Sequence, residues 1–122
     1  MNILIAVGDL RITGELNQTL TAKKIAAALP FHTTFNTWGD EIYFSIPVET
    51  DLEETAVEEV QMGDLGYWPP GKAFCIFFGP TPMSTDGKIV PASAVNIVGK
   101  VLGDAKKFKD VMHESQIMLT AL

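Results

Sequence analysis

Hydrophobic and polar residues alternate along much of this chain in the manner of β-strands that bury one face. In the segment 41–46, for example, Ile42, Phe44 and Ile46 share one face, and the residues between them carry polar groups. Comparable segments end at glycine, proline or Gly-Asp pairs, which are typical of turns. The predicted strands are 2–7, 10–16, 31–36, 41–46, 65–68, 73–78, 95–102 and 115–122.

One stretch, at about residues 20–29, has the pattern of a substantial helix. Thr19 is a suitable N-cap, and the stretch is rich in alanine and straight-chain residues. Its apolar positions recur at helical spacing and form one stripe: Ala22, Ile25 and Leu29. Pro30 ends the helix, because proline lacks the amide hydrogen that a helix interior requires.

Strands therefore dominate, and they are not separated by the alternating helices of a parallel sheet. Closure into a barrel removes the exposed edges that so many strands would otherwise leave. We expect a mainly β protein, a closed eight-stranded barrel with one capping helix at about 20–29 and a short C-terminal helical turn at 105–109. The length predicts a single domain over 1–122. The acidic segment 49–60 fits either a helical turn or a strand.

The stretch 63–82 holds five of the eleven aromatic residues, four of the seven prolines and the only cysteine. It predicts two strands joined by Pro69-Pro70-Gly71-Lys72, a type II turn in which Gly71 takes a positive φ. The second strand is apolar on both faces, so both faces must be covered. We expect the set with the larger side chains, Phe74, Ile76 and Phe78, to lie inside the barrel. The other set, Ala73, Cys75 and Phe77, would lie outside, beneath the loop 80–91.

Composition and charge narrow the range of functions. The net charge of −6 argues against nucleic-acid partners, which require a clustered positive field. Cys75 has no second cysteine to pair with, and no spacing of ligands or phosphate-binding motif indicates a metal or a cofactor. The N-terminus lacks the features of a signal peptide, and no apolar run approaches the roughly 18 residues of a spanning helix. A cytoplasmic protein without a membrane partner is expected.

An aromatic groove on the outside of the barrel is the predicted ligand site. The external strip of the strand 73–78 would form its floor, beneath the loop. Aromatic walls with a few converging polar groups are typical of sites for small molecules and for extended or proline-containing peptides. The alternative is that both tryptophans simply lie at the edge of the core. The candidate ligand-binding residues are Trp38, Glu41, Tyr43, Trp68, Phe77, Thr81 and Asn96.

Five motifs extend through nearly the whole chain, to about Asp104. They are N-Q-T-x-T-A-K-K (17–24), W-G-D-E-I-Y-F (38–44), G-D-x-x-Y-W-P-P-G (63–71), F-C-I-F-F-G-P-T-P (74–82) and P-A-S-x-V-N-x-V-G (91–99). Together they make the chain similar to the small prokaryotic cyclophilin-like family. This resemblance implies an eight-stranded cyclophilin-type barrel with a capping helix, in agreement with the fold predicted from the pattern.

The better-known relatives of that fold are peptidyl-prolyl isomerases, whose activity relies on a strand arginine followed by a Phe-Met-x-Gln-Gly-Gly segment. This sequence has no such segment, and its only arginine, Arg11, belongs to the first hairpin. Because a shared fold does not by itself carry function, the leading hypothesis is a binding protein for a small molecule or short peptide. An atypical peptidyl-prolyl isomerase and a homodimeric interaction module are the alternatives.

Overall fold

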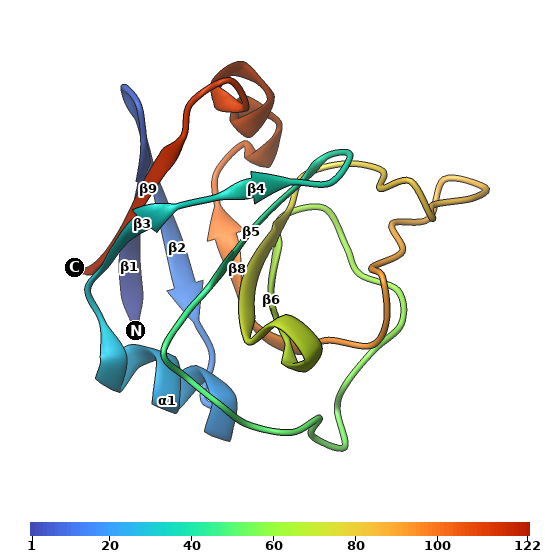
Figure 1. Ribbon diagram of the computed structural model, residues 1–122, viewed down its shortest axis with the longest axis horizontal. Helices are drawn as coiled ribbons and strands as arrows, with labels where there is room; N and C mark the ends of the chain where they lie inside the picture. The colour runs from blue at the N-terminus through green and yellow to red at the C-terminus, as the bar shows by residue number, and fades with distance from the viewer.

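One antiparallel sheet forms the framework of the protein and curls into a nearly closed barrel, as Figure 1 shows for the computed structural model of residues 1–122. Its nine strands pair in the order β3-β9-β1-β2-β8-β6-β7-β5-β4. The strands are β1 (Asn2–Val7), β2 (Leu10–Leu16), β3 (Phe31–Thr34), β4 (Asn36–Thr37), β5 (Glu41–Ser45), β6 (Asp64–Trp68), β7 (Ala73–Phe77), β8 (Asn96–Leu102) and β9 (Gln116–Ala121). The predicted mainly β barrel is confirmed.

The two ends of this sheet, β3 and β4, are neighbours in the chain and are separated only by Phe35. Strand β3 pairs with β9, whereas β4 pairs with β5 on the other side of the barrel. The single strand predicted over 31–36 is therefore divided into two short strands with different partners. This division is why the structure has nine strands where eight were predicted, and it links the two edges of the sheet through one residue.

Strand β7 lies between the main core inside the barrel and a second apolar cluster on the outside. The predicted inner set joins the main core, where the Phe44 and Phe74 rings stack with their centroids 5.5 Å apart. The predicted outer set belongs to the external cluster, which consists of Val60, Ala73, Cys75, Phe77 and Val95. The inward and outward assignment of this strand is thus confirmed, and the outer face of β7 is covered as its sequence requires.

Helix α1 (Leu20–Ala28) covers one end of the barrel, below the sheet in Figure 1. The hydroxyl oxygen of Thr19 accepts a hydrogen bond from the N–H of Ala22 at 3.2 Å, so the predicted N-cap is present. Ala22 and Ile25 are buried against the core. The predicted capping helix is confirmed, and it ends one residue earlier than expected.

The segment 49–60 adopts neither of the two forms considered for it. It is irregular and contacts the rest of the molecule through two isolated β-bridges, Val57 with Val95 and Val60 with Ile89. The Glu53 carboxylate accepts hydrogen bonds from the N–H and the hydroxyl of Thr21, at 3.2 and 2.6 Å. Backbone bridges and side-chain hydrogen bonds together fix the segment, and the hydrophobic pattern encodes neither.

The turn after β6 differs from its prediction. Residues Pro69–Gly71 form a short 3-10 helix, η1, and the positive φ, 48°, belongs to Lys72 instead of Gly71. Gly71 is needed for space: a Cβ atom there would lie 2.9 Å from two ring carbons of Trp68. The glycine therefore allows the indole of Trp68 to lie against the backbone.

The C-terminal helical turn is longer than the predicted 105–109. It forms a second 3-10 helix, η2 (Ala105–Val111), which begins after an Asp104 cap and buries Phe108 in the main core. Strand β9 follows it and pairs with both β1 and β3. None of the helices combines the length and the apolarity needed to cross a membrane.

Candidate functional site

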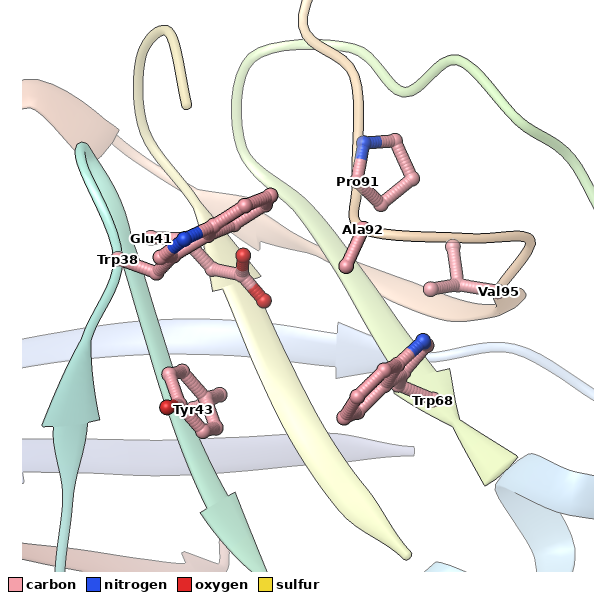
Figure 2. Close-up of a pocket in the computed structure, with 7 residues that line it drawn as sticks. All are labelled: Trp38, Glu41, Tyr43, Trp68, Pro91, Ala92 and Val95. Carbon is pink, nitrogen blue, oxygen red and sulfur yellow. The ribbon is translucent and has the colours of Figure 1, made fainter. Parts of the chain in front are cut away.

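A pocket of about 240 Å³ opens on the outer surface of the barrel, beside the external cluster. Figure 2 shows the side chains of β5 and of the hairpin before it on one side, and Trp68 with the 91–95 segment on the other. Most of the lining is apolar or aromatic. The lining residues are Trp38, Glu41, Tyr43, Trp68, Pro91, Ala92 and Val95.

The β4–β5 hairpin positions Trp38 and Glu41. The N–H of Trp38 donates to the carbonyl of Glu41 at 3.0 Å, and Gly39 turns the chain with a φ of +60°. The hairpin packs on the 79–82 segment, because the N–H of Asp40 donates to the Pro80 carbonyl at 2.9 Å. A Cβ atom on Gly39 would lie 2.9 Å from that same carbonyl oxygen. The 79–82 segment thus supports one wall of the pocket without lining it.

Trp68 ends β6 and forms part of the opposite wall. Its indole N–H donates to the hydroxyl of Ser93 at 2.7 Å, and Gly71 leaves room for its ring. The bond to Ser93 joins the indole to the 91–95 segment, where Ala92 and Val95 complete the wall. Both tryptophans of the protein therefore line this one pocket.

Glu41 is the only charged residue in the lining, and the residue is 6% exposed. Figure 2 shows its carboxylate directed into the space between the rings. Its one side-chain hydrogen-bond partner in the protein is the thiol of Cys75, which is a weak donor. Burial raises the pKa of Glu41 from its usual 4.5 to about 7, and the Cys75 thiol offsets a smaller part of that rise. At neutral pH this carboxyl can therefore exist in both protonation states.

Cys75 lies beneath the pocket in β7, opposite Tyr43 in the sheet register. It is fully buried, and this burial, together with the nearby Glu41, raises the pKa of its thiol well above the usual value. The thiolate that nucleophilic chemistry requires is therefore disfavoured. Cys75 acts as a small apolar residue of the external cluster, as its apolar surroundings in the sequence predict.

Comparisons with known proteins agree with this architecture. The cyclophilin-like family model matches residues 1–120. The chain belongs to the cyclophilin-like family. It is 38% identical to the hypothetical protein AF2241 from Archaeoglobus fulgidus, whose solution structure aligns with a TM-score of 0.82 over 100% of this chain and 95% of that one. No curated protein matches the sequence.

A more distant likeness is to the structure of McbB in complex with tryptophan. The TM-score is 0.70 at 14% sequence identity, and the alignment covers 97% of this chain but 44% of McbB. At that identity the likeness concerns the fold alone. A fold of this kind thus accounts for less than half of the McbB chain.

Four of the seven predicted ligand-binding residues meet in the pocket of this cyclophilin-like barrel, namely Trp38, Glu41, Tyr43 and Trp68. The other three lie outside it, for three different reasons. Phe77 is completely buried in the external cluster. Thr81 bonds through its hydroxyl to Ser84 and to the Val90 carbonyl, and so organises the loop.

Asn96 is the third residue that lies outside the pocket. Its side-chain NH₂ donates to the Thr21 hydroxyl and to the Asp51 carbonyl, both at 3.0 Å, and its oxygen accepts from the Glu53 N–H at 2.8 Å. These bonds join β8 to helix α1 and the 49–60 segment. Asn96 is thus a structural link between distant parts of the chain, with no free group to offer a ligand in the pocket.

Sequence reasoning missed the wall formed by Pro91, Ala92 and Val95. These residues belong to the P-A-S-x-V-N-x-V-G motif, which was the available signal. Arg11, by contrast, donates to the Gly8 and Leu10 carbonyls at 2.7 and 3.0 Å in the β1–β2 hairpin, and it does not line the pocket. The cyclophilin-like fold therefore does not bring the arginine of this chain to the candidate site.

Proposed function

We propose that this cyclophilin-like protein binds a small organic molecule, or the end group of a larger one, in the aromatic pocket. The observation that carries the proposal is Glu41. A buried carboxyl group whose only side-chain donor is a thiol destabilises a fold, because that weak donor offsets little of its desolvation. A ligand that occupies the pocket and pairs with this group would offset the desolvation.

The size of the pocket supports a compact ligand. Its volume of about 240 Å³ falls below the roughly 300–1,000 Å³ of sites for drug-sized molecules. It corresponds to about eight water molecules at liquid density. An extended peptide would place one side chain in such a space, with the rest of the peptide outside. The walls favour a flat or bulky apolar group that carries one polar atom toward Glu41.

Intrinsic fluorescence provides the test, because the only two tryptophans both line the pocket. The protein would be titrated with a panel of small amines, carboxylic acids and neutral amides. Tryptophan, the ligand named for McbB, emits at the same wavelengths and would be titrated by calorimetry instead. At least one compound is expected to give a saturable change in emission. The variants Trp38→Phe and Trp68→Phe would then show the response of each remaining indole separately.

A matched control separates the pocket from the overall charge of the protein. Glu41→Gln and Glu54→Gln each remove one carboxyl group, but Glu54 is exposed and does not line the pocket. The ligand affinity should change in Glu41→Gln and stay the same in Glu54→Gln. If no compound in the panel changes the emission, or if both variants bind as the wild type does, the proposal is wrong.

A further inference from the structure

We propose that the group recognised in this pocket is an organic ammonium cation, held between the Glu41 carboxylate and the rings of Trp38, Tyr43 and Trp68. This inference rests on the proposed function and specifies its ligand class. The juxtaposition that carries it is one buried carboxyl, with a thiol as its only side-chain partner and no counter-charge, beside three aromatic side chains in a single pocket.

The aromatic side chains favour a cation for an electrostatic reason. The face of an aromatic ring carries negative potential, and a cation within about 6 Å of the ring centre is attracted to it, most strongly by tryptophan. Figure 2 shows rings from two sides of the pocket around the space that the Glu41 carboxylate enters. Such an arrangement is suited to an ammonium group with apolar substituents, because methyl groups can contact the rings while the charge stays near the carboxylate.

The charges around the pocket disfavour an anionic ligand. The lining contains no lysine, arginine or histidine that would neutralise Glu41 or bind an anion. The nearest acidic neighbour on the hairpin, Asp40, is already paired with Lys109 at 3.4 Å. An anionic ligand would be repelled by ionised Glu41, and a neutral ligand would leave that carboxylate without a counter-charge. A cation alone supplies the missing charge.

Protonation of Glu41 gives the inference a distinctive pH dependence. The ionisable groups that face this carboxyl are Tyr43 on β5 and Cys75 on β7, whereas the walls from β6 and from residues 91–95 carry none. A cation binds the ionised form, so its affinity should rise as pH increases through about 7 and then become constant. A neutral hydrogen-bond acceptor would prefer the protonated form and show the opposite trend.

The experiment compares choline with 3,3-dimethylbutan-1-ol, in which carbon replaces the charged nitrogen and the shape is nearly unchanged. Calorimetric titration of the wild-type protein above neutral pH should show choline binding at least about tenfold more tightly than the neutral alcohol. In Glu41→Gln this preference should be reduced by about tenfold, and in Glu54→Gln it should be retained. The wild-type comparison requires no variant, so it remains decisive if a variant does not fold.

The outcomes distinguish this inference from the function on which it rests. If the neutral alcohol binds as tightly as choline, or if choline affinity falls as pH rises, the cation assignment is wrong while a ligand pocket is retained. If neither compound binds, the assignment is also wrong, and the fluorescence panel of acids and amides decides the proposed function separately. A preference for choline that survives in Glu41→Gln would likewise contradict the role given to the carboxylate.

Discussion

Replacing Glu41 by glutamine is expected to stabilise the protein above neutral pH and to have little effect below about pH 5. Glutamine keeps the shape of the side chain and removes the ionisable group. In the native protein, burial raises the pKa of Glu41 to about 7, whereas in the unfolded chain it returns to its usual 4.5. Between these values the native state holds a proton that the unfolded state has released, so the free energy of unfolding falls as pH rises.

The expected magnitude follows from the two pKa values. At about 1.36 kcal/mol per pH unit, the difference between 4.5 and about 7 corresponds to about 3 kcal/mol. The wild type should lose this stability as pH rises to about 7 and lose no more from Glu41 at higher pH. Glutamine avoids the cost of burying a charge, and water in the pocket can bond to its amide. The variant should therefore exceed the wild type by up to about 3 kcal/mol at pH 8, on the order of 10 °C in Tm.

Urea unfolding curves measured from about pH 5 to about pH 9 on the wild type, Glu41→Gln and Glu54→Gln test this reasoning. Glu54→Gln controls for the change in net charge, because Glu54 is exposed. The stability of the first variant relative to the wild type should grow with pH, and that of the second should not. An advantage that is constant with pH, or a Glu41→Gln variant less stable than the wild type at pH 8, would refute the assignment of a raised pKa to Glu41.

Three further predictions concern the surroundings of the pocket. Gly71→Ala places a Cβ atom 2.9 Å from the Trp68 ring, so it should lower the free energy of unfolding in urea by about 1–3 kcal/mol. It should also shift the emission of Trp68, measured in a Trp38→Phe background. Unchanged emission would contradict the packing role of the glycine. Asn96→Ala removes three side-chain hydrogen bonds, one buried and two partly buried, and should cost about 2–4 kcal/mol in urea unfolding. A control substitution at an exposed asparagine should cost less than about 0.5 kcal/mol. Cys75 is buried, so iodoacetamide should label it only in denaturant; rapid labelling of the native protein, followed by mass spectrometry, would show that the external cluster opens.

The sequence predicted those features that depend on local pattern. The apolar residues on both faces of β7 required two covered surfaces, and the structure has the main core on one side and the external cluster on the other. Thr19 and Pro30 bound helix α1 because capping and the missing amide of proline act on adjacent residues. Glu41, Tyr43 and Trp68 could be proposed as neighbours because the predicted strands give each side chain a face, and Trp38 because it lies in the turn directly before the strand 41–46.

Features that depend on distant contacts could not be predicted in this way. Phe35 divides one strand into two because its neighbours pair with opposite ends of the sheet. Thr81 and Asn96 looked like free polar groups. Thr81 instead bonds within its own loop, to Ser84 and Val90, and Asn96 bonds to Thr21 and Asp51, which are far away in the chain. Gly71 suggested a positive φ, whereas its actual requirement is space for the ring of Trp68.

The amino-acid sequence by itself determined the barrel, its capping helix, the two-sided burial of β7 and the aromatic character of one outer surface. Those properties follow from alternation, capping and turn residues, whose effects extend over a few neighbouring positions. Only the tertiary structure decided that the β4–β5 hairpin, the end of β6 and the 91–95 segment enclose Glu41 together. That enclosure removes water from the carboxyl and raises its pKa, and a property set by desolvation exists only when the distant walls have come together.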